Sequence, residues 1–181
     1  MVSFKTSLAA FVAALGMGSA ASASVVTISE TFYNASFSTR RFSFSQFVQG
    51  TGIGAADVRM LGSITITLSD LNGNGARIAT SGSSPIYRAT VDGVTVKTIY
   101  TPAWAFQVSN PFDSQSTVPV SFNEALPVGI DPNGTIGLET VFELSAGDAA
   151  YVSATFEIPG PGPAAILGIA GLAGFGRRRR S

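Results

Sequence analysis

The sequence predicts an all-β protein whose single domain is an antiparallel β-sandwich of the jelly-roll kind. Three observations lead to this prediction. Many short segments alternate apolar and polar residues with a period of two, so each strand would bury one face and expose the other. Turn-forming pairs such as Asp92-Gly93 separate these segments at intervals of about 8 to 12 residues, a spacing typical of sandwiches. No window of about 12 residues in the body of the chain has helical periodicity.

The strands are predicted in order along the chain. The first covers residues 41–48, where phenylalanines alternate with serines, and the second covers residues 63–69, where every second residue is Ile or Leu. The others are expected at residues 85–91, 94–100, 104–108, 117–122, 135–144 and 150–158. Asp92-Gly93 predicts a type I′ hairpin between two of them. The inward side chains expected to form the core are Phe42, Phe44, Ile64, Ile66, Leu68, Phe142 and Phe156.

Residues 1–23 have the layout of a secretory signal peptide. Lys5 is their only charge, an apolar run extends from Leu8 to Met17, and small residues follow. Ala21 and Ala23 fit the A-x-A pattern of a cleavage site, so we expect cleavage after Ala23 and a mature protein that begins at Ser24. An uncleaved anchor is the alternative, but the apolar run is shorter than the roughly 20 residues of a membrane span.

Residues 159–181 form a tail with three parts in a fixed order. Prolines alternate with glycines, an apolar run covers residues 164–175, and an arginine cluster follows; the marker residues are Pro159, Gly160, Pro161, Pro163, Arg177, Arg178, Arg179 and Arg180. The apolar run is shorter than the roughly 20 residues of a full span, so we expect a loose hold on a bilayer. Arginines stay on the cytoplasmic side, and the proline-glycine steps predict an extended segment open to a protease. The alternative is a helix packed on the domain.

This tail resembles a PEP-CTERM sorting signal, in which a proline motif, a short hydrophobic helix and terminal arginines follow one another. In that family the signal is read by exosortase, a membrane-embedded transpeptidase-like enzyme of Gram-negative bacteria. The resemblance implies an exosortase-type membrane protease and, in transit, the inner membrane as partners. It also implies a final location at the cell surface or in the extracellular matrix. The usual tripeptide is Pro-Glu-Pro, whereas here Gly160 stands between Pro159 and Pro161.

The body of the chain also resembles the PEP-CTERM β-domains called choice-of-anchor proteins. The residues that carry this likeness are Phe47, Gly54 and the alternating run at residues 62–68. They look like that family's aromatic-rich segment, which is followed by a glycine and then by an alternating strand. The resemblance implies a surface domain without an assigned molecular activity.

The composition of the predicted domain, residues 24–158, excludes several functions. Six basic and eleven acidic side chains give it a formal charge of −5, so it has no electrostatic reason to bind nucleic acid. The chain has no cysteine, so export brings no disulfides. It has no histidine either, which removes the commonest general base and the commonest metal ligand. We therefore expect no cofactor.

Three acidic motifs are candidate sites. Residues 70–75, Asp-Leu-Asn-Gly-Asn-Gly, match the opening of a calcium loop, but Ser81 stands at the twelfth position where a bidentate Glu is normal. An Asn-Gly hairpin turn is the favoured interpretation of this segment. For residues 131–134, too, a turn is favoured over a metal-binding role. Glu139 and Glu143 lie on one face of a predicted strand, about 13 Å apart by strand rise. That separation is too long for acid/base work on a glycan, so a solvated face is favoured.

Aromatic residues are the fourth candidate site. Tyr100, Trp104 and Phe106 would stack on sugar rings if they lay at an exposed edge, although aromatics of an all-β domain more often belong to the core.

Three functions remain open from the sequence. The first is an exported surface or matrix protein with a structural or adhesive β-domain. The second is a secreted carbohydrate-binding module associated with exopolysaccharide, which needs an exposed aromatic strip. The third, a secreted hydrolase, has the least support, because Ser-His-Asp and Cys-His sites are impossible without histidine and cysteine. We therefore expect a protein that is not an enzyme.

Overall fold

A computed structural model describes residues 23–50 and 58–160. Within these ranges the chain forms eleven strands and no helix. They are β1 (Ser24–Tyr33), β2 (Arg40–Gln49), β3 (Arg59–Ser69), β4 (Ala76–Ala79), β5 (Tyr87–Val91), β6 (Val94–Ile99), β7 (Ala105–Val108), β8 (Ser114–Ser116), β9 (Val120–Ala125), β10 (Thr135–Leu144) and β11 (Ala149–Ile158). The predicted all-β class is confirmed.

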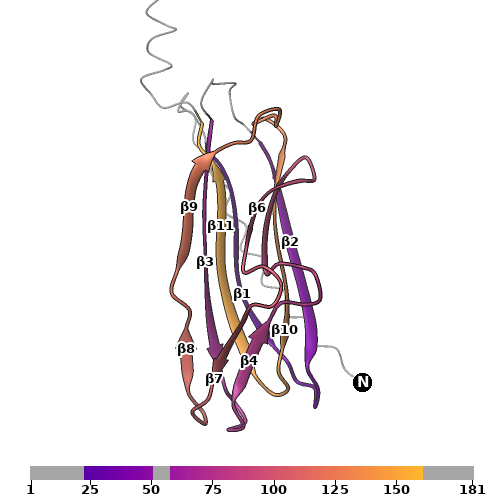
Figure 1. The fold of residues 1–181 in the computed structure, drawn as a ribbon, viewed down its shortest axis with the longest axis vertical. Coiled ribbons are helices and arrows are strands. Elements are labelled where there is room, and N and C mark those ends of the chain that lie inside the picture. The colour runs from indigo at the N-terminus through magenta and orange to yellow at the C-terminus, as the bar shows by residue number, and fades with distance from the viewer. Residues whose placement is uncertain (1–22, 51–57, 161–181) are drawn as a thin grey trace, which may run out of the picture.

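The strands form two antiparallel sheets that face each other as a sandwich (Figure 1). The first sheet has the order β1-β11-β3, and β8 and β9 then pair with successive parts of β3. In the second sheet β2 pairs with β10 along its whole length. On its other side β10 pairs first with β5 and then with β4. β5 pairs in turn with β6, and β4 pairs with β7. One side of the sandwich is therefore bordered by the long strands β1 and β2, and the other by short consecutive strands.

The core lies between the sheets and contains the predicted side chains. Ile64, Ile66, Leu68, Phe142 and Phe156 are completely buried. Phe42 and Phe44 are only half-buried, because β2 is an edge strand, but they pack against this core. An edge-to-face contact of 5.0 Å between the ring centroids of Phe32 and Phe142 joins the sheets near this edge.

Three strands were missed by the sequence analysis, and one was displaced. In β1 the inward positions are Val26, Ile28 and Glu30. The charged residue at the third of these positions interrupts the alternation of apolar and polar residues that predicts a strand. β4 and β8 have only four and three residues. The strand predicted at 117–122 begins later, at Val120, because Pro119 has no N–H for a ladder.

The turns were predicted with mixed success. The hairpin at Asp92-Gly93 is confirmed, since it joins β5 to β6 and both residues have positive φ, 49° and 78°. The hairpin expected at residues 70–75 is wrong. That segment carries the chain from β3 in the first sheet to β4 in the second, so it is a crossing between layers. Residues 131–134 form a turn, in which Asp131 Oδ1 accepts a hydrogen bond of 2.9 Å from the Asn133 N–H.

Both ends of the domain lie at the same end of the sandwich. Ser24, the first residue of β1, is the register partner of Ile158, the last residue of β11 (Figure 1). Of the sequence-predicted sorting residues, Ala23 and Ser24 precede or begin β1, and Pro159 and Gly160 follow β11. Ala21, Pro161, Pro163 and the cluster Arg177–Arg180 lie outside the described residues. In the described ranges no helix is long and apolar enough to cross a membrane.

Candidate functional site

A groove opens on the side of the sandwich bordered by short strands. It lies where β6 gives way to β7 in the second sheet and β8 gives way to β9 in the first. Its volume is about 370 Å³, and its lining residues are Tyr100, Trp104, Phe106, Ser116, Thr117, Val118 and Val120. We call it the aromatic groove. Its position follows from the topology, because both edges are interrupted at the same level.

One wall of the aromatic groove is a row of three nearly parallel rings. The centroids of Tyr100 and Trp104 are 4.1 Å apart with an interplanar angle of 24°, and those of Trp104 and Phe106 are 6.5 Å apart at 17°. All three side chains are half-buried, with one side packed against the core. The two interpretations from the sequence therefore both apply, because these aromatics support the core and also line an open surface.

The backbone between β6 and β7 is strained where it builds this wall. Tyr100 has φ of 52° and Ala103 has φ of 76°, a region that residues other than glycine rarely adopt. Neighbouring backbone bonds hold the segment, since the Ile86 N–H donates to the Tyr100 carbonyl at 3.0 Å and the Thr80 N–H donates to the Trp104 carbonyl at 3.1 Å. Strain of this kind persists only where the surroundings fix it, and it is concentrated at functional sites.

The opposite wall is the segment between β8 and β9. Thr117 anchors it, because its N–H donates to the Ile66 carbonyl at 2.8 Å and its Oγ1 accepts from the Ile66 N–H at 3.1 Å. The neighbouring Val118 is 82% exposed. The Tyr100 hydroxyl donates to the Val118 carbonyl at 3.4 Å, which links the two walls. Among the lining residues there is no carboxylate, amine or guanidinium.

The calcium interpretation of residues 70–75 is not supported by the geometry. Asp70 is 2% exposed, and its carboxylate accepts four backbone N–H groups. Oδ1 accepts from Asn72 at 3.2 Å and Gly73 at 2.9 Å, and Oδ2 accepts from Gly75 at 3.0 Å and Phe112 at 3.2 Å. Donors rather than oxygen ligands converge there. The described residues contain no group of three or more acidic side chains that would hold a metal.

A second buried carboxyl lies beside this one. Asp148 is completely buried, accepts from the Ser145 hydroxyl, and accepts from the Leu71 N–H at 3.4 Å. Burial raises the pKa of Asp148, and the charge of Asp70 adds to the increase, although both hydrogen bonds oppose it. Burial also favours a higher pKa for Asp70, but the four N–H donors outweigh it and the net shift is downward. The pair is enclosed by loops and organises the crossing from β3 to β4.

Glu139 and Glu143 have separate partners, and the face they share is only partly solvated, because both are half-buried and Val141 between them is buried. Glu139 forms an ion pair with Arg88, and Glu143 Oε1 accepts a hydrogen bond of 3.0 Å from the Ser81 hydroxyl. Neither lines the aromatic groove.

Comparisons with known proteins add little. No protein-family model matches the chain, and no curated protein matches it. Among solved structures, the chain is similar to a carbohydrate-binding module, TmCBM61, in complex with β-1,4-galactotriose. The TM-score is 0.39 and the identity 12%, over 76% of this chain and 87% of that chain. A likeness of this size carries no argument about the ligand.

Proposed function

We propose that this protein is an exported, non-catalytic β-domain that binds neutral glycan chains in the aromatic groove. The observation that carries the proposal is the row of Tyr100, Trp104 and Phe106, whose nearly parallel rings line an open groove. A pyranose ring has an apolar C–H face that packs on an aromatic face and hydroxyl groups around its rim. Ser116 and Thr117 line the wall opposite the rings, and the Ser116 hydroxyl shares a hydrogen bond of 2.8 Å with Thr67 Oγ1. Its volume falls in the usual range for small-ligand sites, about 300 to 1,000 Å³.

The absence of charge in the lining favours a neutral glycan. Recognition of uronate or sulfate groups uses arginine or lysine, and the lining residues include neither. The formal charge of −5 on residues 24–158 would also repel a polyanion at low ionic strength.

A binding role fits the residues better than hydrolysis does. Glycoside hydrolysis uses two carboxyl groups about 5 to 9.5 Å apart across the scissile bond. The groove is lined by no carboxylate, and the chain lacks the histidine and cysteine that other hydrolases use.

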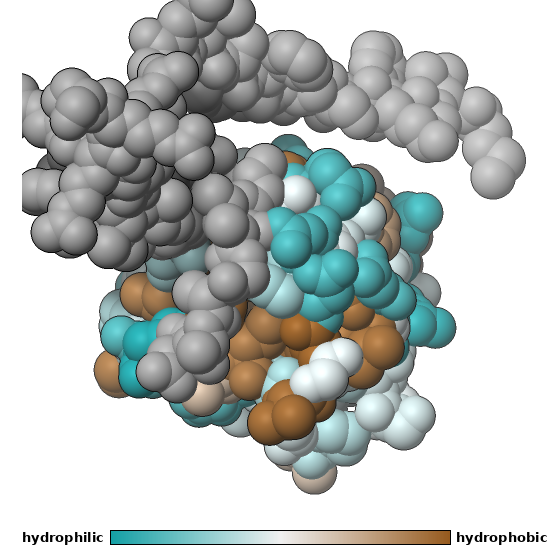
Figure 2. Space-filling model, turned by 90° about the horizontal axis from the view of Figure 1, so that it is seen from above, coloured by the Kyte–Doolittle hydropathy of each residue, from teal (hydrophilic) through white to brown (hydrophobic). Residues whose placement is uncertain are grey.

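Export and tail sorting remain proposals from the sequence. The fold is compatible with them, because Ser24 and Ile158 bring both targeting segments to one end of the sandwich. Apolar residues gather at this end (Figure 2), where Val58, Leu126, Val128 and Ile130 line a hollow of about 250 Å³. Exosortase processing predicts a mature protein that starts at Ser24 and ends near Pro161, which mass spectrometry of protein from the native host would detect. A mature chain that retains Arg180 would contradict processing.

The glycan proposal is tested by binding of the full chain to a panel of neutral polysaccharides and to alginate as an acidic comparison. We expect binding to at least one neutral glycan and a loss of about tenfold or more for Trp104→Ala. Phe37→Ala is the matched control, because Phe37 is an equally aromatic but fully exposed side chain in the connection from β1 to β2. Failure of every neutral glycan to bind, or equal binding by Trp104→Ala, would overturn the proposal.

A further inference from the structure

We propose that β2 is a docking edge for a second copy of this chain, and that the two β2 strands pair antiparallel around a two-fold axis through Phe44. β2 hydrogen-bonds to β10 and to no other described strand, so its other edge has no partner among residues 23–50 and 58–160. The edge is ten residues long, and its register with β10 is unbroken. An unpaired strand edge of this kind is a template for another strand.

Beyond Arg40 and Arg41, which are exposed at its start, β2 has no residue that protects this edge. Residues 42–49, Phe-Ser-Phe-Ser-Gln-Phe-Val-Gln, contain no charge, no proline and no glycine. Such a segment has the pattern of chains that pair with copies of themselves. Phe47 and Val48 are 63% and 40% exposed, so β2 presents two large apolar side chains to solvent near its C-terminal end. On the opposite side of the sandwich the edges are short strands of three to six residues.

The other long edge, β1, is protected against pairing. Val26 and Ile28 of β1 face the core, and Glu30 follows on the same inward face, half-buried. A strand added to β1 would take this carboxylate out of water, which is costly for an unpaired charge. Inward-pointing charges are one way in which proteins keep edge strands unpaired. We therefore expect the second copy of the chain to pair with β2 and not with β1.

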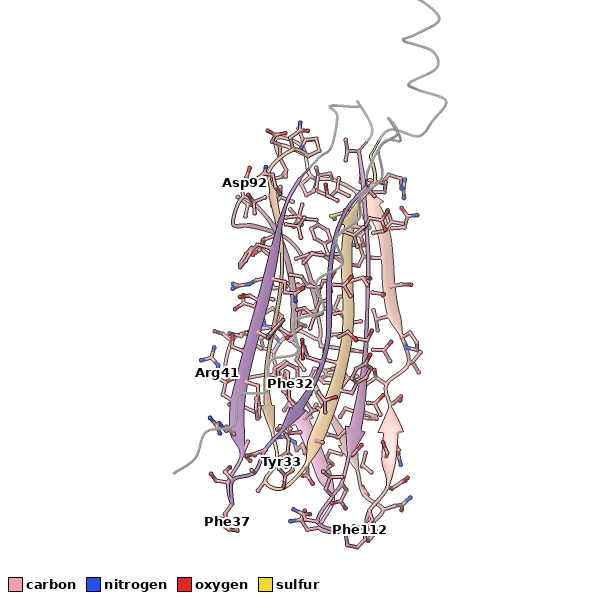
Figure 3. The ribbon with its side chains drawn as sticks, turned by 180° about the vertical axis from the view of Figure 1, so that it is seen from behind. Phe32, Tyr33, Phe37, Arg41, Asp92 and Phe112 are labelled. Carbon is pink, nitrogen blue, oxygen red and sulfur yellow. The ribbon has the colours of Figure 1, made fainter. Side chains whose placement is uncertain are left out.

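The two-fold register through Phe44 places complementary side chains opposite each other. On the outer face Arg41 lies opposite Phe47 of the second copy, and Ser43 lies opposite its Ser45. Arg41 projects from β2 away from the sandwich (Figure 3), so its guanidinium is free to cover an aromatic face. On the inner face Phe44 meets Phe44. The contact is isologous, so it closes as a dimer and does not propagate into a fibre.

Two double variants of the full chain, purified in mild detergent, test the edge and its register. Ser43→Lys/Ser45→Lys places lysine opposite lysine, whereas Ser43→Lys/Ser45→Glu places lysine opposite glutamate at the same exposed positions. We expect a dimer for the wild type and for the Lys/Glu variant, and a dimer about tenfold weaker for the Lys/Lys variant. A monomeric wild type, or equal dimerisation by both variants, would overturn the proposal.

Spin labels test the register directly, because the chain has no native cysteine. In the proposed dimer, labels at Ser45→Cys are about 7 Å apart along the strands and broaden each other's spectra, and labels at Gln49→Cys are about 34 Å apart. A label at Ser121→Cys, exposed on β9 at the opposite edge, should show no such short distance. Strong coupling at Ser121, or equal separations at residues 45 and 49, would place the contact elsewhere.

Discussion

Asn34 provides a stringent test of how the end of the sandwich remote from Ser24 and Ile158 is held together. It is completely buried in the connection between β1 and β2. Its amide Nδ2 donates to the carbonyls of Ser38, Leu144 and Ser145 at 2.8 to 2.9 Å. Its Oδ1 accepts from the N–H and the hydroxyl of Ser36 at 3.1 and 2.6 Å. One side chain therefore joins the β1–β2 connection to the end of β10.

The cost of Asn34→Ala follows from these bonds. The bond to the Leu144 carbonyl is buried, and an unsatisfied buried acceptor costs about 1 to 3 kcal/mol. The other bonds of the amide are partly buried and contribute about 1 kcal/mol each. We expect a total loss of about 4 to 6 kcal/mol, which is a large part of the roughly 5 to 15 kcal/mol of a typical domain.

Urea denaturation of the full chain, followed by tryptophan fluorescence of Trp104, measures this loss. Ser36→Ala is the control, because it removes only a part-exposed hydroxyl and should cost about 1 kcal/mol. Asn34→Asp is the sharper variant, since a carboxylate would face three carbonyl oxygens without an N–H to donate. If Asn34→Ala lowers the free energy of unfolding by no more than Ser36→Ala, then the amide does not hold this end together.

Three further predictions concern buried polar groups and the two proposed surfaces. Thr140 Oγ1 is buried with no hydrogen-bond partner among the described residues, so Thr140→Val should raise the free energy of unfolding by about 1 kcal/mol. Thr117→Val should instead lower it by about 1 to 2 kcal/mol, because the Ile66 N–H loses its acceptor; equal effects in urea denaturation would contradict both. The pKa of Asp70 is held below 3.8, so its carboxylate contributes stability above pH 3.8 that is lost as pH falls through its folded pKa. Asp70→Asn should therefore lower the melting temperature at pH 7 and make the melting temperature depend less on pH in the acid range. The pKa of Asp148 is raised above 3.8, so this group contributes stability at acid pH that is lost as pH rises through its folded pKa. Asp148→Asn should therefore raise the melting temperature at pH 7. Melting curves between about pH 3 and 8 would contradict the opposite roles of Asp70 and Asp148 if the two variants shifted the melting temperature alike. The dimer-breaking variant Ser43→Lys/Ser45→Lys should bind a short oligosaccharide as the wild type does but bind the polymer less tightly; equal losses for both ligands would mean that the substitutions disturb the groove itself.

The sequence predicted the layers of the fold better than its connections. Strict alternation at Ile64, Ile66 and Leu68 gives the inward face of β3 directly, and these residues are buried. Alternation fails in β1, where Glu30 occupies an inward position at an edge and is half-exposed there. It also cannot say whether a turn joins neighbours in one sheet or crosses to the other. Asn-Gly pairs suit both, so the segment from β3 to β4 was mistaken for a hairpin.

The candidate site was half accessible to sequence reasoning. Tyr100, Trp104 and Phe106 were named because aromatics in a β-domain are the residues that meet sugars or fill cores. Their stacking depends on positive φ at Tyr100 and Ala103, which a sequence without glycine or asparagine at those positions gives no reason to expect. The opposite wall at residues 116–120 is brought near by the common interruption of both edges, which is a property of the topology.

The arrangement of the two proposed surfaces explains why the polymer should distinguish the dimer from the monomer. The aromatic groove borders β7, at the edge of the second sheet opposite to β2, so pairing through β2 leaves both grooves uncovered. Ser24 and Ile158 are at one end of the strands, so the tail joins the domain at that end. A dimer therefore displays two separate grooves to one long glycan, and the second contact becomes intramolecular once the first has formed. A short oligosaccharide reaches one groove only, so its affinity should not depend on β2.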